Sequence, residues 1–207
     1  MSRIYFYKLT VDNGAAPCIR AGLLSLAICK PMIRKTAREG DLIFGFAANS
    51  LHKDNRLIYA ARVTHALHNG RYFKDQRYAN REDCIYTFKG GRYQRRKSAK
   101  HHDKPTDLRH DLGDFPQYSR ANVLLSADFR YFGKSGSDIY KARFPAVANA
   151  VKELGRGQRV RLRPSLRLEL EAMKDWIWLE TPRKVMGNPS RSSASNVCHR
   201  TKSCGVA

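Results

Sequence analysis

The feature that most constrains the fold is a pair of strand-like runs within residues 40–64, GDLIFGFAANSLHKDNRLIYAARVT. Residues 42–46 are mostly apolar, and residues 57–64 alternate between two sets of side chains, which predicts two β-strands. Asp54 and Asn55 between them are typical of a turn. The first run ends in small and polar residues where a core strand would stay large and apolar. This strand end is therefore a candidate rim of a binding cleft: Ala47, Ala48, Asn49 and Ser50.

The remaining periodic segments are short and of both types. Helices are expected at residues 32–38, 145–154 and 166–179, because Pro31, Gly155 and Ser165 are residues typical of helix ends. Residues 23–28 fit either a strand or a helix, and residues 92–109 are so charged that they predict a surface segment. Further strands are expected at residues 4–9, 83–88, 122–126, 128–132 and 159–163. Many short strands with few helices predict an α+β domain built on a compact, twisted, partly closed β-barrel with flanking helices.

A chain of 207 residues has room for one domain with a full hydrophobic core. We expect that domain to span residues 1–182. After Pro182 the chain is rich in Ser, Asn and basic residues and has no acidic residue. This composition predicts a disordered basic tail over residues 183–207.

Charge is the most unusual property of the composition. The chain has 39 Lys and Arg against 18 Asp and Glu, a net charge of +21. Such a field attracts polyanions, so nucleic acid is the first partner to consider. No apolar run approaches the roughly 20 residues of a spanning helix, so no membrane insertion is expected.

Cysteine usage and the N-terminus predict a cytoplasmic protein. The chain has five cysteines without a CxxC pair, as in a reducing compartment, and residues 1–10 do not resemble a secretory signal. Cys29 and Cys84 are expected to be small buried hydrophobic residues. Cys18, beside Pro17, is a candidate thiol nucleophile for which no activating partner can be named.

Two basic segments are candidate phosphate-binding sites, because guanidinium groups pair bidentately with phosphate oxygens. On a strand over residues 159–163, alternation would send three arginines to one face, next to Arg156. The second segment surrounds Tyr93, which could stack on a base. A solvated strand face and a mobile basic loop are the alternatives. The candidate residues are Arg156, Arg159, Arg161, Arg163, Arg95, Arg96 and Lys97.

Candidates for acid–base chemistry are few. Asp128 follows a strand end, a common place for catalytic residues; the alternative is a turn carboxylate paired with Arg130. His101, His102 and Asp103, together with His110 and Asp111, form the cluster that most resembles metal ligands, but their spacing matches no known type of site. We therefore expect no metal and no cofactor. Asp128, His110 and Asp111 remain as weak catalytic candidates.

Asn49 and Ser50 are the candidate base-binding residues of the cleft. The amide of Asn49 offers a donor and an acceptor in one plane, which suits a base edge, and the neighbouring alanines leave room for a flat ring. The alternative is that both residues start a loop by capping their own backbone.

Four blocks of the chain resemble the family called nucleotide modification associated domain 2: SLAICKPMIRKTAREGDLIFGFAANS, NRLIYAARVT, ANVLLSADFRYFG and LGRGQRV. The resemblance implies a protein acting with DNA base-modification systems and with other proteins of such systems. More distantly, the order of helix, Gly-Asp, strand and strand is similar to the PUA-like group, which includes EVE, YTH and ASCH domains. These domains hold a modified base in a barrel cleft, often over an aromatic floor. The sequence holds no aromatic cage within one short motif, and the aromatic candidates are Phe44, Phe46, Tyr59, Tyr131 and Phe132, for most of which a place in the core is the favoured alternative. Of these, Phe46 and Tyr59 are the residues that we assign to such a cleft here.

Together these features predict a nucleic-acid-binding protein that recognises a modified or flipped base in a barrel cleft, with DNA favoured over RNA. A free nucleotide remains open as the ligand. The alternative from another class is an enzyme that makes or edits a modified nucleotide or base. A third interpretation, a protein that coats nucleic acid by charge alone, predicts no pocket and no base preference.

Overall fold

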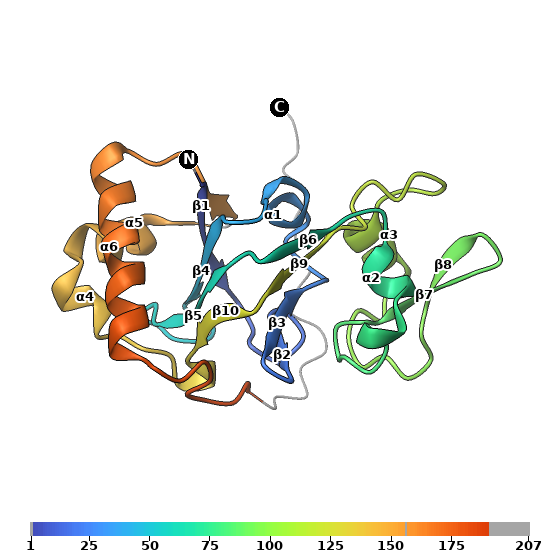
Figure 1. The fold of residues 1–207 in the computed structure, drawn as a ribbon, viewed down its shortest axis with the longest axis horizontal. Helices are drawn as coiled ribbons and strands as arrows, with labels where there is room; N and C mark the ends of the chain where they lie inside the picture. The colour runs from blue at the N-terminus through green and yellow to red at the C-terminus, as the bar shows by residue number, and fades with distance from the viewer. Residues whose placement is uncertain (1, 156, 191–207) are drawn as a thin grey trace.

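The computed structural model describes residues 2–155 and 157–190 (Figure 1). In this part of the chain the strands form three sheets. The first sheet has the order β10-β5-β4-β1-β11 and consists of β10 Asp128–Tyr131, β5 Leu57–Arg62, β4 Leu42–Ala47, β1 Ile4–Leu9 and β11 Gln158–Arg159. The second, β2-β3-β9-β6, consists of β2 Cys18–Arg20, β3 Leu23–Leu26, β9 Val123–Ser126 and β6 His65–Leu67. The third pairs β7 Tyr86–Lys89 with β8 Arg92–Arg95.

The helices lie at the two ends of this arrangement and beside the second sheet. α4, α5 and α6 cover the outer face of the first sheet, whereas α2, α3 and the β7–β8 pair lie at the opposite end of the molecule (Figure 1). α1, α3, α5 and α6 each begin with a proline, whose missing N–H costs nothing in a first helical turn. The helices are α1 Pro31–Thr36, α2 Arg71–Lys74, α3 Pro105–Leu112, α4 Tyr140–Arg143, α5 Pro145–Glu153 and α6 Pro164–Glu180, with short 3-10 turns η1 Gln76–Tyr78 and η2 Gly133–Ser135.

The first sheet is buried on both faces, because its strands alternate two sets of apolar side chains. Phe44 and Phe46 of β4 pack in the cluster that includes the helical residues Val151 and Met173. Ile43, one residue earlier in β4, belongs instead to the cluster shared with the second sheet. β1 and β4 are parallel, and sheets of parallel strands are normally buried on both faces.

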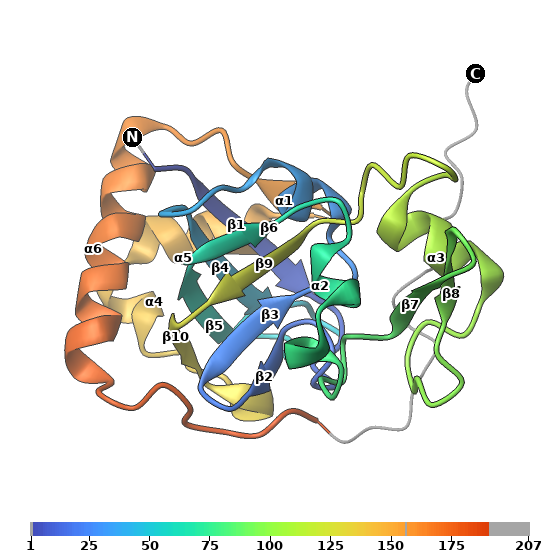
Figure 2. The same cartoon turned by 45° about the vertical axis from the view of Figure 1, so that its right-hand side comes forward.

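Two bent strands join the first and second sheets. β5 continues through a short bend into β6, and β9 continues into β10 after Ala127 (Figure 2). The two long strands stay paired across the bend, with Arg62 opposite Asp128 on one side and His65 opposite Leu125 on the other. The α+β class is thus confirmed. Among the described strands no closed barrel is detected.

Several expected boundaries are wrong. The charged segment 92–109 holds β8 and most of α3, because its few apolar side chains pack inward, Tyr93 among them. The strand expected over residues 83–88 begins only at Tyr86, and the one expected over residues 159–163 ends at Arg159. Within the described residues, no helix is long and apolar enough to cross a membrane.

The first part of the expected tail is ordered. The backbone N–H of Tyr131 donates to the carbonyl of Lys184, and that of Met186 donates back to Tyr131, so this segment runs alongside β10. The N–H of Ser190 donates to the carbonyl of Asp12. The fold therefore continues past Pro182 to at least Ser190. Residues 191–207 of the expected tail lie outside the described residues.

A polar pair is enclosed in the core between the two sheets. The hydroxyl of Tyr131 donates to Oδ2 of Asp12 at 2.8 Å, and Asp12 is almost fully buried. Its other oxygen, Oδ1, has no hydrogen-bond partner among the described residues. Burial raises the pKa of Asp12 to about 6, and the hydrogen bond from Tyr131 only partly offsets that rise.

We expect this carboxyl to make the stability of the protein depend on pH. Between its ordinary pKa near 4 and its folded pKa of about 6, the folded chain keeps a proton that the unfolded chain has lost. The free energy of unfolding should therefore fall by about 2 kcal/mol as the pH rises through this window. Chemical denaturation at a series of pH values measures it. Asp12→Asn should remove this part of the pH dependence, and an unchanged profile in that variant would contradict the assignment.

Gly45 in β4 should not tolerate a side chain. A Cβ at this position would meet the ring of Tyr59 and lie 2.6 Å from Cδ1 of Leu9, in a part of the core where neither can move away. Gly45→Ala should lower the free energy of unfolding by about 1–3 kcal/mol. Gly155→Ala is the matched control, because a Cβ there meets nothing within 4 Å. Equal unfolding midpoints for the two variants would contradict this account of β4.

Candidate functional site

The two aromatic residues assigned to a base-binding cleft lie on opposite faces of the first sheet. Phe46 and Tyr59 are both 0% exposed. Phe46 packs against Tyr140 on the helical face, with ring centroids 5.2 Å apart. The hydroxyl of Tyr59 instead bonds that of Tyr7 at 2.8 Å in the cluster between the two sheets. In this structure the two rings cannot form the floor of one cleft.

Asn49 and Ser50 are exposed; Ser50 bonds the segment after β1, and Asn49 bonds Asn55 within its own loop. The hydroxyl of Ser50 donates to the carbonyl of Thr10 at 3.0 Å. Oδ1 of Asn49 accepts a hydrogen bond from Asn55, whose amide also binds the carbonyl of Ala47. The small residues at the end of β4 thus lead into a hydrogen-bonded loop, and neither side chain caps its own backbone in a described contact.

Asp128 lies at the bend between β9 and β10 and is held by two partners. Its carboxylate pairs with Arg62 at 3.2 Å and accepts a hydrogen bond from Nε1 of Trp178 at 2.5 Å. The interpretation that Asp128 pairs with Arg130 is wrong, because Arg130 donates to backbone carbonyls and stacks on Trp178. His110 lies half-buried on α3, directly before Asp111.

The basic loop around Tyr93 is built differently from the expected phosphate-binding loop. Arg95 donates to the carbonyls of His101 and Ala99. Arg96 donates to the carbonyls of Tyr86 and Ala79 and approaches Sγ of Cys84 at 3.7 Å. The rings of Phe73, Phe88 and Tyr118 surround Tyr93, which is buried and cannot stack on a base. Lys97 alone of the three predicted phosphate ligands keeps an exposed side chain without a described partner.

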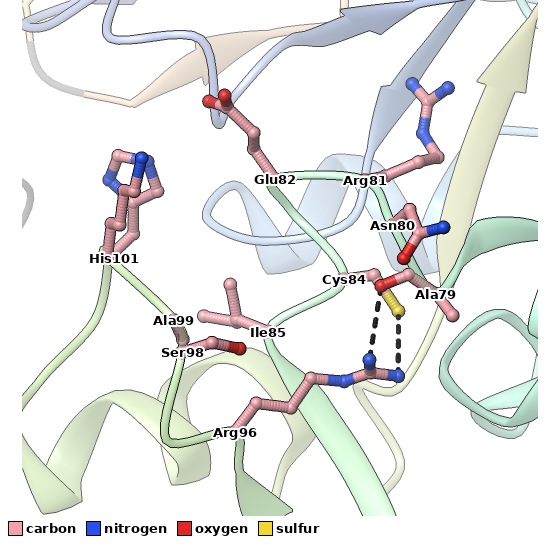
Figure 3. Close-up of a pocket in the computed structure, with 11 residues that line it drawn as sticks. Ala79, Asn80, Arg81, Glu82, Cys84, Ile85, Arg96, Ser98, Ala99 and His101 are labelled. Atoms are coloured by element: carbon pink, nitrogen blue, oxygen red, sulfur yellow. Dashed lines mark hydrogen bonds between the residues drawn. The ribbon is translucent and has the colours of Figure 1, made fainter.

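Arg96 also forms one wall of a pocket of about 210 Å³ (Figure 3). Its guanidinium points toward Ala79 and Cys84, and the side chains of Glu82 and His101 stand farther along the same rim (Figure 3). This pocket is small and mixed in polarity. Both of its arginines, Arg81 and Arg96, donate to backbone carbonyls, so neither guanidinium is free to bind an anion in the pocket.

The other predicted arginines do converge. Arg159, Arg161 and Arg163 line one groove of about 550 Å³, although only Arg159 belongs to a strand. Within the described residues none of the three makes an ion pair; Arg159 lies over the ring of Phe6 at 5.8 Å. Arg156 lies outside the described residues. The rest of the groove comes from α5 and the start of α6: Ala146, Asn149, Ala150, Glu153, Ser165 and Leu166.

A second constellation joins three side chains from separate parts of the chain. Cys29 precedes α1, His102 precedes α3, and Asp111 lies on α3. Sγ of Cys29 lies 3.3 Å from Nε2 of His102, and Nδ1 of His102 lies 2.5 Å from Oδ2 of Asp111. An imidazole between a thiol and a carboxylate can accept the thiol proton while the carboxylate orients the ring.

The carboxylate of this constellation is firmly held. Asp111 is 0% exposed and also accepts hydrogen bonds from the backbone N–H of Cys29 and from the hydroxyl of Tyr86, both at 2.8 Å. Burial alone would raise the pKa of Asp111. The hydrogen bond and charge of His102, with Arg34 and Tyr86, outweigh burial and hold that pKa below its ordinary value.

Sequence reasoning missed this constellation. The sequence places His102 and Asp111 in one cluster that resembles metal ligands, but it predicts Cys29 to be a small buried hydrophobic residue. No spacing signal connects Cys29 to the other two, because these contacts form only when the segments before α1 and around α3 meet. Cys18, the thiol candidate, is buried in β2, and burial raises its pKa to about 12. Among the described residues no group of three or more potential ligands could hold a metal ion.

Comparison with known proteins identifies a family for this chain. The family model described as "Nucleotide modification associated domain 2" matches residues 1–196. No curated protein and no solved structure matches the chain significantly. The matched segment includes the arginine groove and all three residues of the constellation. Because the model covers nearly the whole chain, the chain belongs to the nucleotide modification associated domain 2 family.

Proposed function

We propose that the protein binds nucleic acid in the course of base modification, and that the groove lined by Arg159, Arg161 and Arg163 is its phosphate-binding surface. The observation that carries this proposal is that three arginines without a described ion pair line one groove, with Glu153 as the acidic residue in its lining. Guanidinium groups pair with phosphate oxygens and release counterions, which supplies affinity without sequence preference.

Several other arginines are bonded within the protein, which supports the arginine groove as the phosphate-binding surface. Arg34 and Arg81 are buried, and they donate to backbone carbonyls inside the fold, as Arg95 and Arg96 do at its surface. The net charge of +21 is therefore not spread evenly over groups that are free to bind a ligand. The arginine groove combines exposed charge with a concave surface, which suits a phosphate backbone better than a flat face does.

The proposed function also includes a PUA-like fold and direct contact with a base. The strands that bend from one sheet into the next support a PUA-like, partly closed barrel. Asn49 and Ser50 remain the proposed base-contacting residues, since their side chains are exposed at the end of β4. DNA is the nucleic acid that we propose, in keeping with the base-modification systems that the family name suggests.

Replacing two groove arginines should weaken binding in a salt-dependent way. Arg161→Gln with Arg163→Gln should reduce the slope of log affinity against log salt concentration by about two, one for each lost phosphate contact. Fluorescence anisotropy with a labelled duplex, a labelled single strand and a labelled RNA measures the slope and the preferred partner.

The matched control for this experiment is Arg71→Gln with Arg92→Gln. These arginines are exposed on α2 and β8, at the end of the molecule opposite to α5 and α6 (Figure 1), and their loss changes the net charge equally. An equal loss of affinity in both double variants would show that charge alone, rather than the groove, determines binding. Affinity that does not respond to salt would contradict phosphate binding altogether.

Base contact by Asn49 predicts a different response. Asn49→Ala should weaken the discrimination between oligonucleotides with and without a modified base, and should leave the salt slope unchanged because no phosphate contact is lost. Ser50→Ala is the neighbouring variant for comparison. Unaltered discrimination in Asn49→Ala would exclude this residue from base recognition without affecting the role of the arginine groove.

A further inference from the structure

We infer that Cys29, His102 and Asp111 form a thiol-dependent acyl-transfer centre, in which Cys29 attacks the carbonyl carbon of an ester, thioester or amide. This inference goes beyond nucleic-acid binding and does not depend on it. Cys29 lies on the segment that joins β3 to α1, His102 on the segment that joins β8 to α3, and Asp111 on α3 itself, so none of the three lines the arginine groove.

The distances assign a role to each group. Nδ1 of His102 faces the carboxylate of Asp111 at 2.5 Å, so this nitrogen carries the proton and donates it to the hydrogen bond. The opposite nitrogen, Nε2, is then the one that faces Sγ of Cys29, at 3.3 Å, and it can accept the thiol proton. Cys29 is the nucleophile, His102 the general base, and Asp111 the positioning residue that fixes the ring.

The backbone around the centre is unusual. Cys29 and His102 have φ values of 58° and 55°, in the left-handed region that residues other than glycine rarely adopt. Such conformations persist where surrounding contacts over-determine them, and they gather at functional sites. Here contacts hold Cys29 from both sides: its N–H donates to Asp111, and its carbonyl accepts from Arg34 at 2.6 Å.

The imidazole partner separates Cys29 from the other described cysteines. Cys29 and His102 are both buried, each 7% exposed, so the thiol–imidazole pair is largely shielded from solvent. Cys18 and Cys84 are 2% exposed and have no imidazole partner in any described contact. Burial raises the pKa of Cys18 to about 12 and that of Cys84 to about 11, which keeps both in the unreactive thiol form.

The reaction balances with water or an amine as the only co-reactant. His102 takes the proton of Cys29 as sulfur adds to the carbonyl carbon, and it returns that proton to the leaving alcohol, thiol or amine as the bond to the leaving group breaks. The product is an acyl group held as a thioester on Cys29. Water or an amine, deprotonated by His102, then attacks the thioester, and the thiol is restored as the proton returns to sulfur.

The first test uses the unaltered full-length protein and p-nitrophenyl acetate. Release of p-nitrophenol should show a burst, and peptide mapping by mass spectrometry should place the acetyl group on Cys29. Cys18 and Cys84 in the same sample are the matched controls, because all five cysteines are mapped at once. Acetyl transfer to another cysteine at the same rate or faster would overturn the proposal.

Variants then separate chemistry from structure. His102→Gln keeps a group that can bind Asp111 but cannot take the thiol proton, so acylation of Cys29 should slow by about 100-fold or more. Asp111→Asn should lower the saturating acylation rate while leaving the ester concentration for half-saturation unchanged, which a general loss of structure would not do. Circular dichroism establishes that each variant is folded. A folded His102→Gln variant that acylates at the unaltered rate would refute the centre.

Discussion

The buried guanidinium of Arg34 is the interaction on which much of this structure depends. Arg34 is fully buried on α1, and its nitrogens donate to the backbone carbonyls of Cys29, Asp111, Arg120 and Asn122. It also faces the carboxylate of Asp111 at 3.6 Å. One side chain thus joins the turn before α1, the end of α3 and the segment leading into β9. Removing one partner of such a buried pair costs about 3–5 kcal/mol, because the other charge remains in the core without compensation.

The same network holds the reactive groups in place. Arg34 binds the carbonyl of Cys29, Asp111 binds its N–H, and the other oxygen of that carboxylate faces His102. The strained backbone of Cys29 is therefore fixed from both sides by groups that are themselves buried. Preorganisation of this kind reduces the reorganisation that a nucleophile and its base would otherwise need before reaction.

The arginines of the protein fall into two groups with different roles. Some guanidinium groups, as in Arg34, Arg81 and Arg96, replace backbone partners where loops and turns leave carbonyls unsatisfied. Others line the arginine groove and make no described ion pair, although Glu153 lines the same groove. The first group stabilises an irregular half of the fold in which sheets and helices are short. The second group remains available to a polyanion, at the end of the molecule that is covered by α5 and α6 (Figure 1).

Local sequence determined the elements with a strong apolar period: β1, β4, β5, α5 and α6 lie close to their expected positions, and the α+β class follows from them. The gathering of Arg159, Arg161 and Arg163 also followed from sequence, because these residues are close in the chain. Tertiary structure alone decided which aromatic rings would be buried, since the two faces of the first sheet are both covered and neither Phe46 nor Tyr59 can reach solvent. Tertiary structure alone also decided the role of Cys29. His102 and Asp111 come from a highly charged part of the chain, and its sequence does not show which of its side chains face inward. Contacts between residues distant in sequence depend on how helices and sheets pack, and no periodicity within one segment encodes them.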